Sequence, residues 1–389
     1  MNSNNQWLDP LYLNSFLDEE EKLIRENTKN YCQKNLLPNV VKNNRNYYFD
    51  KDLYKDLGKM GLLGSTVKGY GSPEINKVSY GLIAFELESI DSSYRSAVSV
   101  QTSLVCHPIE NFGSKEQKEE YLPDLIKGNL IGCFGLTESE AGSDPSSMKT
   151  NFIEHEDHYI INGSKNWITN APIADIFLIW ALNEKKDIRL FLIPKNTKGV
   201  KTSVIENKTS LKISPTGQII LENVKIPKEN IIPNTSGWKS VYSCLNNARY
   251  GIAWGVLGSA NSCWQISKDY TENRIMFKKP LAKNQLIQKK LAIMQTEISL
   301  GLSACLHAGR SMDKGKDLKI AISMLKRNNC KKSIEIVRES RDMMGANGLL
   351  EEYHIMRHLV NLETVKTYEG AEDIHALVLG KFQTNMDSF

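Results

Sequence analysis

The sequence has no excess of charge of either sign. Its 389 residues include 49 Lys or Arg and 45 Asp or Glu, which gives a formal net charge of +4. These charges are interleaved along the chain, whereas nucleic-acid-binding proteins gather basic residues into a patch or a stripe. The composition therefore gives no support to a nucleic-acid partner.

Paired cysteine motifs are also missing. The seven cysteines are scattered and odd in number, and no two of them form a Cys-x-x-Cys pair. Disulfide frameworks and structural zinc sites usually show paired or regularly spaced cysteines. They are Cys32, Cys106, Cys133, Cys244, Cys263, Cys305 and Cys330. The pattern predicts reduced thiols in a cytosol-like compartment.

No segment predicts a membrane span or a targeting signal. The longest uncharged run, Tyr250 to Ser267, approaches spanning length but contains Ser, Asn and Gln, so a buried helix is predicted instead. The first 13 residues have neither an apolar signal core nor an Arg-rich amphipathic pattern. We expect a cytoplasmic protein, or one of the mitochondrial matrix if a transit peptide has been removed.

The common nucleotide-binding and metal-binding motifs are absent as well. No Gly-x-Gly-x-x-Gly follows a strand pattern, and no Gly-x-x-x-x-Gly-Lys-Ser/Thr occurs, so a nucleotide cofactor must bind in another way. His354 and His358 stand four residues apart, a spacing that can bind a metal on a helix. Because no third ligand is evident, we expect a partly buried helix face there and no metal.

What is present is a change of pattern along the chain, from helical to strand-like and back to helical. Asp18 with Glu21, and Ser114 with Gln117, have the spacing of capping boxes at helix starts. The segment HYIINGSKNWITN (158–170) carries an Asn-Gly turn signal between strand-like runs. We predict an α+β protein with a helical domain (1–130), a middle antiparallel β domain (131–236) and a C-terminal helix bundle (237–389), which the family resemblance described next implies to be a four-helix bundle.

Six blocks of the sequence, in order, resemble the signature segments of the acyl-CoA dehydrogenase family. They are FGLTESEAGSDPSS (134–147), GSKNWITN (163–170), CLNNARYGIAWGVLG (244–258), NRIMFKKPLAKNQLIQKKLA (273–292), RDMMGANG (341–348) and TYEGAEDIHALVLGK (367–381). Within the family the chain is most similar to the glutaryl-CoA dehydrogenases. The resemblance extends from about residue 7 to the C-terminus, and it implies the same three-part fold.

The resemblance implies an FAD site between the domains. The segment 134–143 would reach the flavin ring, residues 167–169 would flank it, Arg274 would bind the pyrophosphate, and residues of the bundle would come from a neighbouring subunit. The residues implied are Phe134, Leu136, Thr137, Gly142, Ser143, Trp167, Ile168, Thr169, Arg274, Phe277, Gln285, Asp342, Met343, Met344, Gly345, Ala346 and Ala371. Ala371 departs from the family pattern, where Thr is frequent.

Glu369 is the general base that the resemblance implies. In the family, the carboxylate at this position removes a proton from the carbon beside a thioester carbonyl, while a hydride leaves the next carbon for the flavin. Donors must hold the thioester oxygen as it gains charge, and the family uses the backbone N–H at the Glu position and a ribityl hydroxyl of FAD. Gly370 would keep the backbone slim where the substrate approaches.

Arg95 is the residue that points to the substrate. It lies at the edge of an uncharged helical run, where a guanidinium needs a counter-ion, and Glu88 seven residues earlier can form a structural pair with it. In glutaryl-CoA dehydrogenases the matching Arg instead binds the distal carboxylate of the acyl group. The resemblance assigns the substrate to Arg95, Ser96, Ser99, Glu88, Ser143, Tyr242, Leu245, Asn246, Arg249 and Gly370.

The reaction implied is oxidative decarboxylation of glutaryl-CoA to crotonyl-CoA in a homotetramer, with an electron-transferring flavoprotein as acceptor. Other hypotheses remain open at this point. They are a non-decarboxylating glutaryl-CoA dehydrogenase, a fatty or branched-chain acyl-CoA dehydrogenase, an acyl-CoA oxidase, and a binding protein without a working base.

Overall fold

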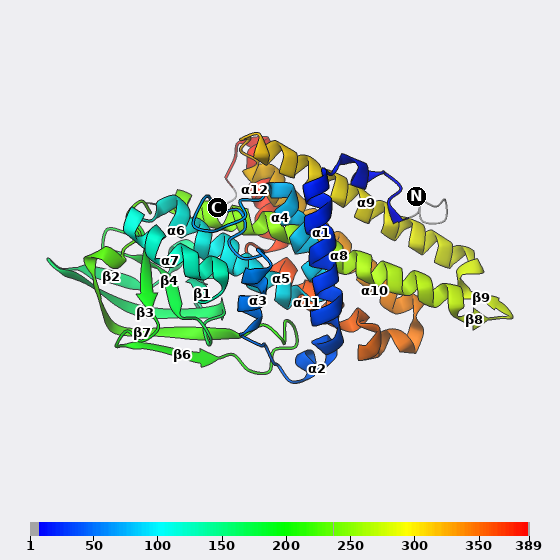
Figure 1. Ribbon diagram of the computed structural model, residues 1–389, viewed down its shortest axis with the longest axis horizontal. Helices are drawn as coiled ribbons and strands as arrows, with labels where there is room; N and C mark the ends of the chain where they lie inside the picture. Colours follow the sequence, from blue (N-terminus) through cyan, green and yellow to red (C-terminus); the bar gives the residue numbers. More distant parts are fainter. Residues whose placement is uncertain (1–7, 236, 388–389) are drawn as a thin grey trace.

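The computed structural model describes residues 8–235 and 237–387, so Trp7, where the family resemblance begins, lies outside them. Figure 1 shows an elongated molecule with a β-sheet at one end and long helices at the other. The N-terminal helices lie between the sheet and the far end of the C-terminal bundle. The predicted order of helical, β and helical parts is confirmed.

Seven α-helices precede the sheet in the described residues. They are α1 (Glu19–Tyr31), α2 (Val40–Arg45), α3 (Leu53–Lys59), α4 (Lys77–Glu88), α5 (Ser92–Ser99), α6 (His107–Phe112) and α7 (Lys115–Lys127). The capping boxes predicted at Asp18 and Ser114 start α1 and α7. Helix α5 continues through a π-helical segment (Val100–Cys106) into α6, and all its residues are buried, as its lack of charge predicts apart from Arg95.

Replacement of Ser114 tests the cap of α7. Its hydroxyl accepts a hydrogen bond from the Gln117 backbone N–H at 3.2 Å, and Gln117 Oε1 accepts from the Ser114 N–H at 3.0 Å. We expect Ser114→Ala to lower the free energy of unfolding by about 1 kcal/mol, since one N–H of the first turn loses its partner. Thermal unfolding measures this, and Ser114→Asp, which restores an acceptor, should keep wild-type stability.

The middle of the chain forms a seven-stranded sheet. Its strands are β1 (Gly132–Gly135), β2 (Asn151–Glu154), β3 (His158–Thr169), β4 (Ile176–Leu182), β5 (Ile188–Pro194), β6 (Val200–Val204) and β7 (Thr216–Pro227). Two strand pairs are parallel: β1 with β4, and β2 with β4, which share one residue pair. The other pairs in this sheet are antiparallel. The sheet is therefore mixed, because β2 and β3 form a connection long enough to bring β4 alongside β1 in the same direction.

The predicted Asn-Gly turn at 162–163 is wrong. Strand β3 runs unbroken through Asn162 and Gly163, and the pairing with β7 shifts register there. Gly163 has a φ of 144°, and a Cβ at this position would meet Thr150 Oγ1 at 2.5 Å. Glycine is needed at this site for a β-bulge and a close approach of two strands, which are alternatives to a hairpin turn.

The C-terminal bundle is built on one long helix. Helix α8 (Trp238–Asn273) packs against both α4 and α10 (Lys319–Met343), and its uncharged run is buried over most of its length. The other elements are β8 (Ile275–Met276), β9 (Lys279–Pro280), α9 (Gln285–Asp313), α11 (Ile355–Thr367) and α12 (Glu372–Thr384). None of the helices within the described residues is long and apolar enough to cross a membrane.

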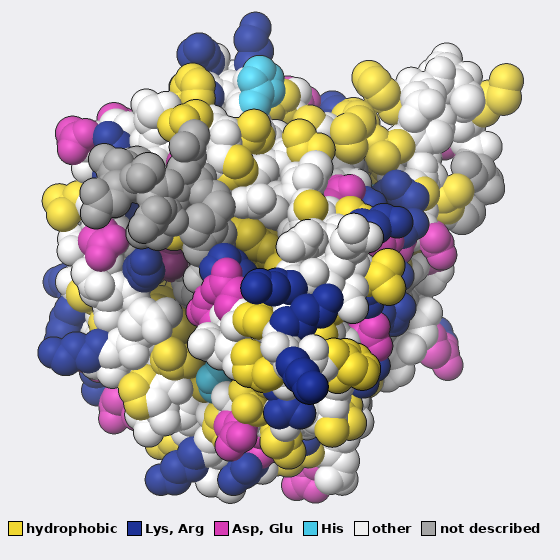
Figure 2. All heavy atoms as spheres, turned by 90° about the vertical axis from the view of Figure 1, so that its right-hand side faces the viewer, with side chains coloured by type: hydrophobic (Ala, Val, Ile, Leu, Met, Phe, Trp, Pro, Cys, Tyr) yellow, Lys and Arg dark blue, Asp and Glu magenta, His cyan; other side chains and the backbone are white. Residues whose placement is uncertain are grey.

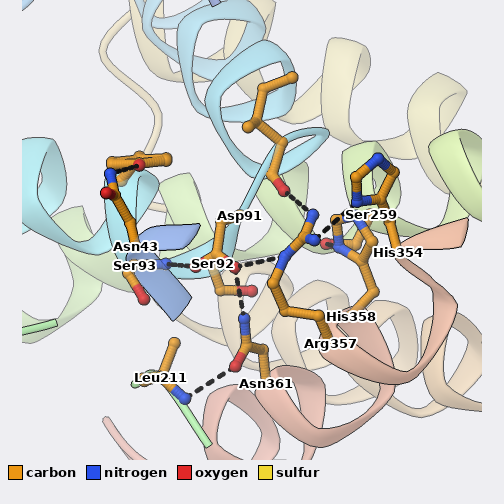
Figure 3. A network of polar contacts seen from close by, with 12 residues as sticks. Asn43, Asp91, Ser92, Ser93, Leu211, Ser259, His354, Arg357, His358 and Asn361 are labelled. Carbon is orange, nitrogen blue, oxygen red and sulfur yellow. Dashed lines mark hydrogen bonds and ion pairs between the residues drawn. The ribbon is translucent and has the colours of Figure 1, made fainter. Parts of the chain in front are cut away.

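A buried polar network centred on Asp91 joins all three parts of the fold (Figure 3). Asp91 caps α5 by accepting from the Ser93 N–H, and its other carboxylate oxygen accepts from Arg357 Nε and Asn361 Nδ2, both at 2.9 Å. Asn361 Oδ1 in turn accepts from the Leu211 N–H at 2.7 Å. One carboxylate therefore links the helical domain and the bundle directly, and reaches the middle domain through a single amide.

All seven cysteines are free and buried. Burial raises the pKa of the Cys330 thiol to about 11 and that of Cys244 to about 12. The expectation of reduced thiols agrees with this arrangement, because no cysteine in the structure is paired with another.

Candidate active site around Glu369

Glu369 lies in a tight turn between the end of α11 and the start of α12. Its φ is 52° and that of Gly370 is 95°, so two consecutive residues adopt left-handed backbone conformations. A Cβ on Gly370 would meet His375 Nε2 at 2.8 Å and Arg249 Nη2 at 3.3 Å. Glycine is thus required by the packing of the chain itself, while its predicted role in substrate approach stays a prediction.

The Glu369 carboxylate faces inward. The residue as a whole is half-buried, but Oε2 is fully buried and has no hydrogen-bond partner among the described residues. Burial raises the pKa of Glu369 above its usual range, and the charges of Arg95, Arg249 and Lys326 oppose that rise. An unpaired buried carboxylate is a high-energy group whose location indicates function.

Arg95 and Glu88 form a buried ion pair beside this carboxylate. Arg95 Nε donates to Glu88 Oε2 at 2.6 Å, and the two side chains are 1% and 0% exposed. The Ser92 hydroxyl donates to the other Glu88 oxygen at 2.8 Å. Burial alone would lower the pKa of Arg95, but Glu88 and Tyr368 outweigh it and keep the guanidinium charged. The structural pair considered from the sequence is therefore present.

Two residues of this pair's environment were missed by the sequence analysis. The Tyr368 hydroxyl accepts a hydrogen bond from Arg95 Nη2, and the guanidinium carbon lies 5.8 Å from the centre of the Tyr368 ring. Gly255 on α8 leaves room for the pair, because a Cβ there would meet Glu88 Oε2 at 2.2 Å. Tyr368 could have been found from its position next to Glu369, whereas Gly255 had no local signal.

The other residues predicted to bind the substrate lie in three places: on α5, on α8 and on the loop after β1. Ser96 and Ser99 lie buried on α5 with Arg95, and Ser99 Oγ has no hydrogen-bond partner within the part of the chain described. Tyr242, Leu245, Asn246 and Arg249 follow one another along α8, and Arg249 Nε donates to the Glu369 carbonyl at 2.7 Å. Ser143 is exposed on the loop after β1.

Residues predicted to contact the flavin ring lie in two connected segments of the middle domain, one formed by β1 and the loop after it and the other by the end of β3. Asn166 N–H donates to the Thr137 carbonyl at 2.8 Å, which ties the loop after β1 to β3. Trp167 has a φ of 62° and a 59% exposed side chain, which is unusual for a large aromatic residue. The side chains of Phe134, Leu136 and Ile168 are instead buried in the core, so any contact they make with a cofactor is through the backbone.

A second set of predicted cofactor residues lies at the opposite end of the chain's long axis. The hairpin β8–β9, the start of α9 and the end of α10 form the right-hand end of the bundle in Figure 1, far from the sheet. Arg274, Phe277, Gln285, Asp342, Gly345 and Ala346 are exposed there. Met343 and Met344 are buried in the bundle, which leaves them only backbone groups for a ligand. Within one chain, the predicted flavin-ring residues and the predicted residues of the bundle are therefore far apart. Ala371, the N-cap of α12, lies beside Glu369.

His354 and His358, the pair spaced four residues apart, both lie beside other polar side chains. His354 has a left-handed backbone before α11, and its Nδ1 lies 2.8 Å from Arg357 Nη1. His358 is fully buried, and its Nδ1 lies 3.0 Å from the Ser259 hydroxyl (Figure 3). No group of three or more His, Cys, Asp or Glu within the described residues could hold a metal ion.

The side chains of the predicted cofactor residues are of the kinds that bind FAD. An exposed indole and threonine hydroxyls on the middle domain can face a planar ring system, and a guanidinium with neighbouring lysines on the β8–β9 hairpin can bind a pyrophosphate. The cofactor would supply a two-electron acceptor for a hydride.

The chain is similar to known proteins along nearly its whole length. A glutaryl-CoA dehydrogenase of Mycobacterium smegmatis, solved in complex with FADH2, is 40% identical, with 98% of this chain and 99% of that chain covered and a TM-score of 0.97. An acyl-CoA dehydrogenase of Bacillus subtilis is 31% identical over 94% of this chain and 98% of its own length. A short-chain specific acyl-CoA dehydrogenase of Megasphaera elsdenii is 31% identical over 90% and 94%.

Family models cover nearly the whole chain. The N-terminal, middle and C-terminal domains of acyl-CoA dehydrogenases match residues 18–129, 133–224 and 235–383. The relatives and the models agree on an oxidoreductase that acts on an acyl-CoA and carries a flavin. The chain belongs to the acyl-CoA dehydrogenase family, and FAD is its cofactor.

Proposed function

We propose that this acyl-CoA dehydrogenase oxidises and decarboxylates glutaryl-CoA, giving crotonyl-CoA and CO2. The observation that carries the proposal is the buried Arg95 guanidinium near the Glu369 carboxylate. The acyl chain of a monocarboxylic substrate would leave this charge facing methylene groups, which is costly. A dicarboxylic acyl group places its distal carboxylate against it.

The donors around Arg95 support a carboxylate ligand. Within the described residues its hydrogen bonds use Nε and one N–H of Nη2, so both N–H groups of Nη1 and the second N–H of Nη2 remain. The unpartnered Ser99 hydroxyl lies one helical turn further along α5. Together they offer the fork of donors that a carboxylate accepts. Glu88 serves in this proposal as the counter-ion that keeps Arg95 in place before substrate binds.

Glu369 performs the proton transfers. Its ionised carboxylate accepts the α-proton of the thioester while the β-hydride goes to the flavin. The Glu369 backbone N–H donates no hydrogen bond to any described residue, so it is available to the thioester oxygen as negative charge develops there. The product of this step is an α,β-unsaturated thioester, and Glu369 is left protonated.

Loss of CO2 follows from the same arrangement. The C–C bond to the distal carboxylate breaks, and its electron pair moves through the new double bond into the thioester. Protonated Glu369 then returns its proton to the γ-carbon of the resulting dienolate. FAD would supply the two-electron acceptor for the hydride, and we propose an electron-transferring flavoprotein as the protein that accepts its electrons.

Product analysis after anaerobic mixing with glutaryl-CoA tests the proposal. Crotonyl-CoA and one CO2 per reduced flavin support it. Glutaconyl-CoA without CO2 would make the protein a non-decarboxylating dehydrogenase. No bleaching with glutaryl-CoA, together with rapid bleaching by butyryl-CoA, would assign it to the short-chain monocarboxylic enzymes, such as the Megasphaera relative.

A homotetramer is part of the proposal. Leu286, Ile293 and Leu300 recur every seven residues on α9 and are 68%, 52% and 56% exposed, which is typical of a helix face that packs against another chain. Figure 2, which views the molecule from the right-hand end of Figure 1, shows hydrophobic side chains next to basic ones at that end of the molecule. A neighbouring copy there would bring Arg274 and Gln285 to the FAD site of its partner.

Substitution of Ile293 tests this assembly. We expect Ile293→Glu to lower both the molar mass measured by sedimentation and the amount of FAD that stays bound. The reason is that a charge in the apolar face of α9 would separate the subunits and remove Arg274 and Gln285 of the neighbouring copy from the FAD site. Leu23→Glu, at a 60% exposed position on α1, is the matched control and should change neither. A dissociated Ile293→Glu protein that keeps FAD fully bound would contradict the shared site.

A further inference from the structure

A lysine that the reaction above does not use lies beneath the Glu369 turn. Lys326 on α10 is 1% exposed, and its ammonium group donates to the carbonyl oxygens of Lys366, Tyr368 and Gly370 at 3.1, 2.9 and 2.7 Å. These bonds account for all three of its N–H donors. No carboxylate in the described residues forms an ion pair with it, which is rare for a buried lysine.

The turn that it binds is strained. Left-handed backbone at a residue other than glycine costs about 1 to 3 kcal/mol and persists only where the surroundings fix it. Besides the three carbonyls held by Lys326, the Glu369 carbonyl is held by Arg249 from α8. The Lys366 carbonyl belongs to the last turn of α11, where the negative end of the helix dipole also attracts a cation. Cations from two helices thus fix four carbonyls of one short segment.

We propose that Lys326 is a positioning residue for proton abstraction: it holds the turn so that the Glu369 carboxylate and backbone N–H both face the substrate, and its charge favours the ionised carboxylate. This inference rests on the role proposed for Glu369. Lys326 itself touches neither the substrate nor the cofactor, since its donors are occupied by the chain.

The charges around Glu369 come from five helices. Arg95 on α5, Arg249 on α8 and Lys326 on α10 are the cations that oppose the rise of its pKa. Tyr80 and Glu88 on α4, Tyr368 beside Glu369 in the turn and His375 on α12 also lie nearby. Burial lowers the pKa of His375 to about 3, so this imidazole is neutral and cannot replace a lost lysine charge. Removal of Lys326 therefore raises the pKa of Glu369 further.

Two substitutions of Lys326 separate its effect on the position of the turn from the effect of its charge on Glu369. Lys326→Met removes the donors and the charge while retaining the aliphatic stem, and Lys326→Arg retains the charge in a planar geometry that cannot copy three convergent N–H bonds. Lys208 provides a matched control in the middle domain. Its ammonium donates to the Leu211 and Ser214 carbonyls at 2.9 and 2.7 Å and to the Thr216 hydroxyl at 2.7 Å, so its donors bind the chain as those of Lys326 do, but none of them binds the Glu369 turn.

The measurements are flavin reduction by glutaryl-CoA across pH and amide hydrogen exchange of the peptide covering residues 366–371. For Lys326→Met we expect the maximal rate to fall by about 10²-fold, the scale for a small misplacement of a catalytic group, and the acid limb to move to higher pH. For Lys326→Arg we expect a lower maximal rate with the acid limb unmoved. The peptide should exchange faster in both variants and at the wild-type rate in Lys208→Met.

The outcomes that overturn the proposal are distinct from a failure of the Glu369 assignment. A wild-type rate and acid limb in Lys326→Met would overturn it, and so would unaltered exchange of the peptide in either Lys326 variant. If Lys326→Met does not fold, a wild-type maximal rate in Lys326→Arg has the same effect. Failure of Glu369 as base would appear instead as undiminished reduction by Glu369→Gln with Lys326 intact.

Discussion

Glu369→Gln should slow flavin reduction by glutaryl-CoA by at least about 10²-fold, the lower range for the loss of a general base. The amide keeps the shape of the carboxylate but cannot accept the α-proton. FAD should remain bound, since Glu369 forms no hydrogen bond that holds the fold together through its side chain. Anaerobic stopped-flow spectroscopy at saturating substrate measures the rate.

The pH dependence of the wild-type rate is a second test of Glu369 as the general base. Only the ionised carboxylate accepts a proton, and burial raises the pKa of Glu369, so the rate should fall with decreasing pH at a higher pH than an ordinary glutamate would give. Glu363→Gln, on the exposed face of α11, is the control and should leave the rate unchanged. Undiminished bleaching by Glu369→Gln would remove Glu369 from the mechanism.

Arg95→Met should invert the substrate preference. Loss of one partner of a buried charge pair costs about 2 to 5 kcal/mol, and this loss should appear in kcat/KM for glutaryl-CoA. Butyryl-CoA carries no distal charge, so its kcat/KM should stay equal or rise slightly when an apolar side chain replaces the guanidinium. The measurement is kcat/KM for both substrates on both proteins, with thermal unfolding beside it.

The ion pair with Glu88 makes a matched control necessary. Arg25 on α1 forms a similar pair, at 2.8 Å, with Glu86, which lies on α4 as Glu88 does. Arg25 has no contact with Glu369. Arg25→Met should lower stability and leave the ratio of the two kcat/KM values unchanged. If Arg95→Met behaves in the same way, with equal losses on both substrates and partial rescue by replacement of Glu88, Arg95 is only structural and the glutaryl assignment fails.

Local signals in the sequence predicted the fold well. A capping box depends on residues three apart, and an uncharged helix must be buried wherever it lies, so α1, α7 and α5 could be predicted without knowledge of the fold. The Asn-Gly pair at 162–163 misled because glycine permits both a turn and a bulge. Only Thr150, which approaches from a neighbouring segment, decides between them.

The site was less predictable because it is assembled from distant segments. The resemblance identified Glu369, but its burial depends on α5, α8 and α10 converging on one turn. Lys326 stands in the basic sequence KRNNCKK, where it looks like any solvated lysine, and only the fold shows that it is buried. Met343 and Met344 were assigned to the cofactor because they lie in a signature block, although their side chains fill the bundle core.

The network around Asp91 bears on how far this protein is modular. Three domain models match the chain, which suggests that segments could be exchanged between relatives. Asp91 binds Arg357 and Asn361 with one carboxylate, and Asn361 in turn holds the Leu211 backbone. A chimaera that takes any one segment from a relative must therefore also carry matching groups in the other two. A separate family model matches each of the three segments, but the hydrogen bonds of Asp91 and Asn361 require that the segments be exchanged together.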